Sequence, residues 1–124
     1  MKTKKVICMA KYNLHGRKFV STGNEKGLSN EDTIFHYFQD GQVITGKYKG
    51  GAIAEGFLVG KQTADDELEL LFHCITTGNE LRAGQSKGKI TAATNGQLYL
   101  SFNWNWLNGD NSGGLSFYKE VEQV

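Results

Sequence analysis

Large apolar residues fall on every second position over several stretches of the chain, and the longest of these runs from Gly96 to Trp106. Its apolar members are Leu98, Leu100, Phe102, Trp104 and Trp106. A period of two is typical of a strand with one buried face. Each tryptophan buries about 150–250 Å² when packed, so we predict that this strand anchors the core.

The same alternation, interrupted by turn residues, predicts eight strands. They cover residues 16–22, 31–39, 42–49, 52–61, 67–75, 80–86, 96–106 and 115–121. Residues 87–96 are a weaker segment, which we expect to be a loop with a short strand. No stretch has the period of an amphipathic helix. We therefore predict an all-β fold, an antiparallel meander of about eight strands closed into a small lipocalin-like barrel.

Two glycine turns determine the pairing that we predict for the middle of the chain. Asp40-Gly41 and Gly50-Gly51 each suit a two-residue hairpin. On that register Gly46 faces Glu55. The bulkier, aromatic face is assigned to the interior and carries Phe35, Tyr37, Ile44, Gly46, Tyr48, Ile53, Glu55, Phe57 and Val59. The face assigned to the exterior carries His36, Phe38, Val43, Thr45, Lys47, Ala52, Ala54, Gly56 and Leu58.

The next hairpin turns at Thr77-Gly78-Asn79. Before it, the residues predicted to face inward are Leu68, Leu70, Phe72 and Cys74. A two-residue turn centre at this site puts Gln85 on the inner side, together with Leu81 and Ala83. The same register puts Arg82 beside His73 on the outer side.

Length and composition suggest one domain. We expect residues 1–14 to be an N-terminal extension, disordered or an edge segment, and residues 15–124 to form the barrel. Sixteen glycines and no proline suit short strands joined by tight turns. A net charge of +1 argues against nucleic acid or membrane partners. Two cysteines without metal spacing favour a reduced, cytoplasmic protein.

Six residues are candidates for contact with a ligand inside the barrel. They are Tyr37, Tyr48, Glu55, Gln85, Trp104 and Trp106. A carboxylate enclosed among aromatic rings needs hydrogen-bond donors, and the tyrosines could supply them. Two plainer interpretations stay open, since Glu55 could lie in water at the barrel mouth and the tryptophans could be core residues only.

The sequence indicates no catalytic set, no metal site and no cofactor. Its three histidines lack ligand spacing, and the nucleophile-elbow, P-loop and Cys-x-x-Cys motifs are missing. Phe38, Val43 and Leu58 form an apolar row on the predicted outer face. This row suggests a homodimer interface, or a surface that another segment of the chain covers.

Several short segments resemble a family of small bacterial proteins that often carry the label N-acetylglutamate synthase. They are Gly16-Arg-Lys-Phe19, Thr33-Ile-Phe-His-Tyr37, Tyr48-Lys-Gly-Gly51, Gly56-Phe-Leu-Val-Gly60, Trp104-Asn-Trp106 and Gly109-Asp-Asn-Ser112. The resemblance implies a lipocalin-like barrel over residues 15–121. The chain departs from the family at Phe38, where a histidine is expected, and at Asn103, where a carboxylate is expected. Acetyl transfer also needs a glycine-rich phosphate loop opening a helix, which this chain lacks.

Three functions remain open at this point. The first is a non-catalytic module that binds a small apolar or amphipathic molecule or a protein partner. The second is an enzyme acting on an acyl or amino-acid-derived substrate, with Glu55 as acid or base. The third is a structural protein whose barrel is filled with side chains. The contents of the interior distinguish the three.

Overall fold

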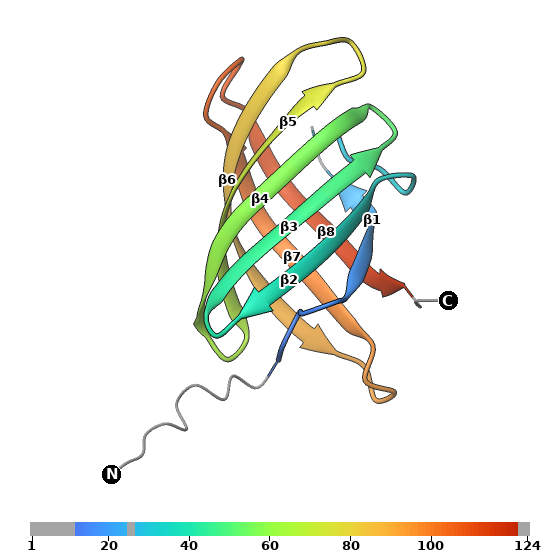
Figure 1. The fold of residues 1–124 in the computed structure, drawn as a ribbon, viewed down its shortest axis with the longest axis vertical. Helices are drawn as coiled ribbons and strands as arrows, with labels where there is room; N and C mark the ends of the chain where they lie inside the picture. Colours follow the sequence, from blue (N-terminus) through green and yellow to red (C-terminus); the bar gives the residue numbers. More distant parts are fainter. Residues whose placement is uncertain (1–11, 25–26, 122–124) are drawn as a thin grey trace.

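Eight antiparallel strands close into a single barrel (Figure 1). The structure is a computed structural model that describes residues 12–24 and 27–121. The strands are β1 (Lys18–Asn24), β2 (Ile34–Asp40), β3 (Val43–Gly50), β4 (Ile53–Ala64), β5 (Glu67–Thr76), β6 (Leu81–Ala92), β7 (Leu98–Trp106) and β8 (Gly113–Val121). Each strand pairs with the next, and β8 pairs with β1. The predicted eight-stranded closed meander is confirmed.

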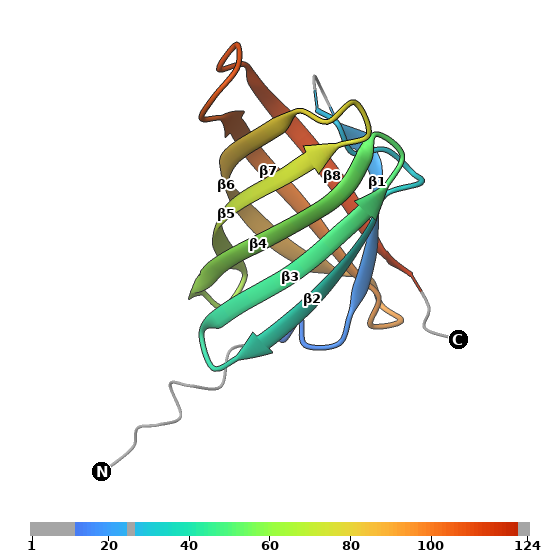
Figure 2. The ribbon, with the colours of Figure 1, turned by 45° about the horizontal axis from the view of Figure 1, so that its top comes forward.

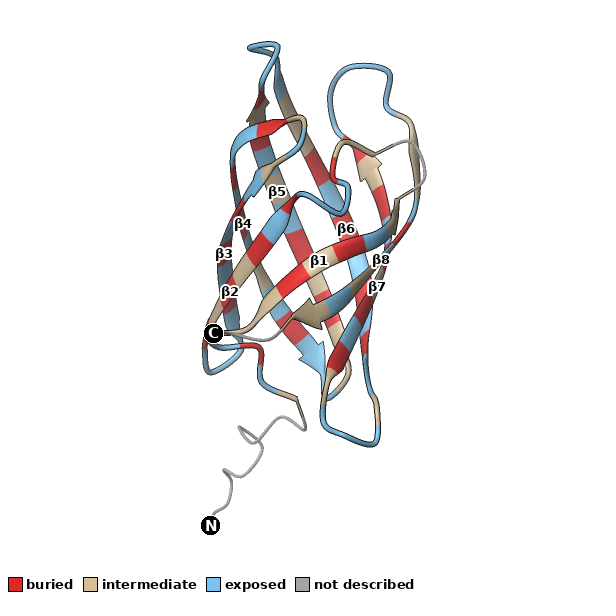
Figure 3. Ribbon diagram, turned by 90° about the vertical axis from the view of Figure 1, so that its right-hand side faces the viewer, coloured by how far each residue is buried: buried red, intermediate tan, exposed pale blue. Residues whose placement is uncertain are grey.

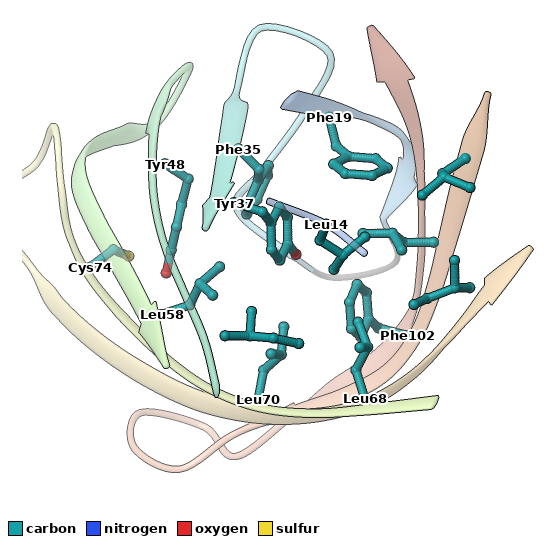
Figure 4. Close-up of a cluster of buried hydrophobic side chains, with 14 of the residues drawn as sticks. Leu14, Phe19, Phe35, Tyr37, Tyr48, Leu58, Leu68, Leu70, Cys74 and Phe102 are labelled. Atoms are coloured by element: carbon teal, nitrogen blue, oxygen red, sulfur yellow. The ribbon is translucent and has the colours of Figure 1, made fainter. Parts of the chain in front are cut away.

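Inward side chains alternate with outward ones, as Figure 3 shows by the alternation of buried and exposed residues along the strands. Every apolar residue predicted to face inward on β7 is buried. Rings and aliphatic side chains from opposite walls meet at the centre (Figure 4). One prediction was too short, because β6 continues through residues 87–92, which were expected to be mainly a loop.

The floor of the barrel is closed by the segment before β1. Leu14, in the expected extension, is fully buried, and its backbone N–H donates to Gln39 Oε1 over 2.9 Å. Gln39 Nε2 donates to Gln62 Oε1 over 2.6 Å, and Gln62 Nε2 donates to the carbonyl of Tyr12 over 3.0 Å. Two buried glutamines therefore hold residues 12–14 across this end. Residues 1–11 of the expected extension lie outside the described residues.

The faces predicted for β2 and β3 are confirmed, although the pairing differs. The turn is centred one residue later than predicted, so Asp40 pairs with Val43 and Tyr37 with Gly46. Gly41 takes a φ of +63° at the first position of this turn, a conformation that favours glycine. A shift of the turn by one residue changes partners by two positions, and side chains stay on the same face.

The faces predicted for β4 are wrong beyond its first residue. Ile53 is buried as expected, but β4 holds one extra residue between Ile53 and Gly56 relative to both neighbouring strands. This bulge leaves Glu55 exposed and reverses the faces of the rest of the strand. Phe57 and Val59 are 44% and 51% exposed. The inward residues are instead Gly56, Leu58 and Gln62.

The faces predicted for β6 are wrong for a related reason. The β5–β6 turn has three residues, Thr77 to Asn79, and Ile75 pairs with Leu81. Asn79 has a φ of +69°, as in three-residue hairpins that end in a left-handed residue. An odd number of turn residues reverses the faces, so Gln85 points outward and Arg82 lies on the same side of the sheet as its partner Cys74.

Aromatic rings lie over inward glycines of the neighbouring strand at three places in the wall. In each pair the two residues are direct cross-strand partners. The pairs are Tyr48 with Gly56, Phe72 with Gly84 and Phe102 with Gly88. A Cβ at Gly84 would stand 2.5 Å from Phe72 Cζ, too close for the ring to stay. The rings therefore require glycine at these inward positions.

We expect Gly84→Ala to lower the free energy of unfolding by about 1–3 kcal/mol, because the new methyl group displaces the Phe72 ring. Gly23→Ala is the matched control, since its Cβ would meet only Phe117 Cδ2 at an ordinary 3.6 Å. Chemical denaturation of both variants measures the effect. Equal stability of the two variants would contradict the ring-on-glycine packing.

Candidate functional site

The end of the barrel opposite the floor is open and leads into a pocket. Four connections surround this mouth, those between β1 and β2, β3 and β4, β5 and β6, and β7 and β8 (Figure 2). The free space inside is about 60 Å³. Its walls carry Asn24, Gly27, Leu28, Ser29, Phe35, Tyr37, Tyr48, Ile53, Leu58, Leu70, Phe72, Cys74, Ser86, Phe102, Trp104, Trp106, Ser116 and Tyr118. This volume holds a few water molecules or a small chemical group.

Stacked and edge-on rings build most of the pocket wall. Phe35 and Tyr48 stack with centroids 4.7 Å apart. Trp104 and Trp106 meet edge to face at 5.1 Å, and Phe72 meets Trp106 at 5.8 Å. Rings in these geometries hold one another in place, so the wall is largely preformed.

Several polar groups around the pocket already have partners. Asn24 Nδ2 donates to Ser29 Oγ over 2.6 Å, and the Tyr48 hydroxyl donates to the carbonyl of His73 over 3.1 Å. Burial raises the pKa of Tyr118, and the side chains of Ser116 and Ser29 lower it, which opposes in part the larger effect of burial. The hydrogen bonds fix the orientation of the side chains that a ligand would meet.

Two polar atoms in the wall lack partners. Asn24 Oδ1 and Trp104 Nε1 are both buried, and neither has a hydrogen-bond partner among the described residues. Trp104 is only 5% exposed. A buried polar atom without a partner costs free energy, about 1–3 kcal/mol. The wall therefore holds one acceptor and one donor whose hydrogen-bonding capacity is unused.

The pocket has no charged lining among the described residues. Burial raises the pKa of Tyr37 and Tyr48 well above the ordinary value near 10, and it also raises the pKa of Tyr118. Burial raises the pKa of the Cys74 thiol as well. All four groups are neutral at physiological pH, so the interior suits a neutral group.

Four of the six predicted ligand residues meet in this pocket. They are Tyr37, Tyr48, Trp104 and Trp106. Glu55 and Gln85 do not, because the β4 bulge and the three-residue β5–β6 turn put both on exposed positions. Gly46, which was predicted to face Glu55, pairs instead with Leu58, whose Cγ would lie 3.1 Å from a Cβ at Gly46. The prediction that the Glu55 carboxylate lies inside the barrel is therefore wrong.

Several polar members of the pocket were not predicted from the sequence. Asn24 is the last residue of β1, and Ser29 lies in the connection between β1 and β2, where alternation along a strand no longer predicts which way a side chain points. Ser116 and Tyr118 alternate on β8, and that alternation was a usable signal. Ser86 was missed through the reversed faces of β6.

The predicted dimer row is also incorrect in part. Leu58 is buried inside the barrel, so it cannot join Phe38 and Val43 on the outside. The outer surface instead carries an apolar group that we call the outer patch, formed by Val43, Phe57, Val59 and Leu71. Gln85 lies beside it, in a shallow outer groove that also includes Asn103 and Asn105.

Two other features bear on the kinds of site present. Within residues 12–24 and 27–121, no three of the histidine, cysteine and acidic side chains come together as a metal site would need. The same part of the chain contains no helix that is long and apolar enough to span a membrane.

Comparison with known proteins gives a single result. Residues 12–121 match the family model described as "Avidin-like protein". No curated protein and no solved structure matches the chain. The label N-acetylglutamate synthase, which the sequence resemblance suggested, has no counterpart in these findings.

The buried phenols predict a loss of stability at alkaline pH. Below about pH 10 the three phenols are neutral in both the folded and the unfolded protein. Above it the unfolded phenols ionise while the buried ones do not, so the free energy of unfolding falls by about 1.4 kcal/mol per pH unit for each phenol. Tyr37→Phe should reduce this slope in denaturation curves. Ionisation of Tyr37 in the folded protein near pH 10, seen by NMR, would contradict this.

Proposed function

The chain belongs to the avidin-like protein family, since the match covers residues 12–121, and on that premise we propose that it binds a small amphipathic molecule in the barrel mouth. In this proposal the protein binds its ligand and does not catalyse a reaction. Its ligand has a neutral polar head inside the pocket and an apolar body along the aromatic wall. The family name suggests biotin as the first molecule to test.

The observation that carries the proposal is the pair of unpartnered polar atoms in the pocket wall. Trp104 Nε1–H can donate to a carbonyl oxygen, and Asn24 Oδ1 can accept from an N–H. A head group with both a carbonyl and an N–H, such as an amide or a cyclic ureide, offers the kind of partner that each atom needs. An apolar wall with a few fixed polar groups is the usual form of a small-molecule site.

The size of the pocket supports a small head group rather than a large enclosed ligand. Free space of about 60 Å³ takes one compact group, and the remainder of the ligand then extends toward the mouth. Leu28 and Ser29, from the connection between β1 and β2, form the wall at that level. Binding therefore leaves one end of the ligand near solvent.

The enzyme alternative has lost the residue on which it depended. Glu55 is exposed on the outer side of β4 and does not line the pocket. The pocket tyrosines and Cys74 have raised pKa values, which makes them poor bases near neutral pH. These features support binding rather than catalysis.

We expect biotin to bind, because its cyclic ureide offers both a carbonyl and N–H groups, and we expect Trp104→Phe to weaken binding about tenfold through loss of the indole N–H. Isothermal titration calorimetry measures both. Tyr99→Phe is the control, since Tyr99 lies on the same strand but faces outward.

The result could contradict the proposal in two ways. The wild-type protein could give neither heat nor a change in tryptophan fluorescence with biotin. Alternatively, biotin could bind with the same affinity to Trp104→Phe, which would place its site away from the pocket.

We also propose that two copies associate through the outer patch. Val59 and Leu71 are direct cross-strand partners and are 51% and 54% exposed. Beside them Lys61, Glu69 and Lys87 follow one another across β4, β5 and β6. With a twofold axis between Lys61 and Glu69, each of these two residues faces the other in the second copy, which favours a second copy as the partner.

We expect Leu71→Glu to shift the protein toward monomer, because a charge in the centre of the patch opposes burial. Analytical ultracentrifugation over a range of concentrations measures this. Leu115→Glu is the control, as an exposed leucine on β8 outside the patch. A wild-type protein that remains monomeric at the highest concentrations would refute the dimer.

A further inference from the structure

We infer that the outer wall formed by β8, β1, β2 and β3 binds an acidic amphipathic helix of a partner protein. This inference goes beyond the proposed function, because it concerns the outside of the barrel and needs no ligand in the pocket. Strands β2, β1 and β8 lie side by side in Figure 3. The wall carries a group of outward residues that we call the basic face, formed by Lys18, Ile34, His36, Lys47, Lys49 and Lys119.

One row across this wall places a histidine between two lysines. Lys18, His36 and Lys47 are successive cross-strand partners on β1, β2 and β3. Each alternates with buried residues along its strand, so the three side chains point outward. Partial burial lowers the pKa of His36, and the positive charges of Lys18 and Lys47 lower it further. The charges of the two lysines therefore act on the same part of the surface.

The next row has lysines at its ends and aliphatic side chains at its centre. Lys119 pairs with Val20, and Ile34 pairs with Lys49. Val20 and Ile34 are themselves partners and join the two halves of the row. Ile34 is 49% exposed, and both lysines of the row are exposed. An apolar strip therefore lies between two positive edges.

The lysines of the basic face lack the acidic neighbours that lysines on β6 have. Lys89 lies 3.3 Å from Glu67, and Lys87 is the cross-strand partner of Glu69. By contrast, none of the four lysines of the basic face forms an ion pair with a residue that the structure describes. Their charge is therefore not balanced within the wall.

The acidic residues of the same four strands do not neutralise the face. They are Glu120 on β8 and Asp40 on β2. Glu120 accepts two hydrogen bonds from Arg17 and one from the backbone N–H of Leu98. Asp40 is the last residue of β2, at the floor end of the barrel. An acidic partner that approaches the centre of the wall therefore meets a positive potential.

The width of the face suits a helix. Neighbouring strands lie about 4.8 Å apart, so β3 and β8 stand roughly 14 Å apart across the wall. An α-helix with its side chains is about 10–12 Å across. A helix laid along the strands can therefore place an apolar stripe on Ile34 and acidic side chains beside Lys49 and Lys119. Docking of an amphipathic helix by its apolar face is a common mode of recognition.

A nucleic acid fits this face less well. The centre of the face offers the aliphatic side chains of Val20 and Ile34, whereas unpaired bases stack on aromatic rings. A net charge of +1 also gives the whole chain little long-range attraction to a polyanion. The local pattern of charge and apolar surface therefore favours a protein segment.

The test is an NMR titration of the isotope-labelled full-length protein with a synthetic helical peptide whose leucine stripe is flanked by glutamates. We expect amide shifts to concentrate on β8, β1, β2 and β3, and added salt to weaken binding. The same peptide with glutamine in place of each glutamate should not bind. Lys49→Gln combined with Lys119→Gln should weaken binding about 3- to 10-fold. Lys87→Gln combined with Lys89→Gln has the same net charge and should bind as the wild-type protein does.

A second pair of variants tests the apolar strip. Ile34→Ser should weaken binding without changing its dependence on salt, because it removes apolar contact and no charge. Leu81→Ser is the control and should have no effect, since Leu81 is 71% exposed on β6, outside the basic face.

Several results would overturn the inference. The acidic peptide could fail to bind at low salt, or its shifts could fall outside the four strands. An equal loss of affinity in the two double variants would show that net charge alone is at work. Tighter binding of a single-stranded oligonucleotide or of anionic lipid vesicles to the basic face would assign it to another class of partner. None of these results affects the proposed function, which the biotin titration tests separately.

Discussion

The contact on which the barrel depends is an aromatic ring lying over a glycine of the next strand. Tyr48 on Gly56, and Phe72 on Gly84, tie β3 to β4 and β5 to β6. A ring fits there only if the glycine faces inward. Because side chains alternate along a strand, one such contact determines the face of every residue that follows in register. These contacts therefore decide which groups line the interior.

The character of the site follows from that choice of faces. With Gly56 and Gly84 inside, the neighbouring positions Glu55 and Gln85 turn to solvent, and the interior remains neutral. The same phase brings Arg82 to the inner side at the mouth. The outcome is a pocket without a charged lining residue among the described residues. Phe57 and Val59 are left outside, where they form part of the outer patch.

Periodicity alone was enough for the parts of the fold without insertions. The alternation on β7 placed Trp104 and Trp106 correctly, and that on β2 and β3 placed Tyr37 and Tyr48. Periodicity failed where one extra residue reverses the inward and outward faces while the alternation of polar and apolar residues continues. The β4 bulge after Ile53 and the left-handed Asn79 both act in this way, since polar and apolar residues alternate equally well in either phase. Glu55 and Gln85 were misplaced for this reason.

The inward glycines carried information that the sequence analysis did not use. Gly56 was assigned to the exterior and Gly84 and Gly88 were given no face, although a glycine opposite an aromatic residue marks a place where a ring needs space. The polar pocket residues at the connection between β1 and β2 could not have been predicted from the sequence pattern. Asn24 and Ser29 meet through a hydrogen bond that depends on the path of the loop, which no spacing rule provides. Their role becomes visible only in three dimensions.

The most direct measurement of the central contact is a nuclear Overhauser spectrum of the assigned protein. The account predicts strong cross-peaks between the ring protons of Tyr48 and the α-protons of Gly56. Cross-peaks from that ring to the side-chain protons of Glu55 or Phe57 would show the opposite phase of β4. They would contradict both the packing and the neutral pocket that depends on it.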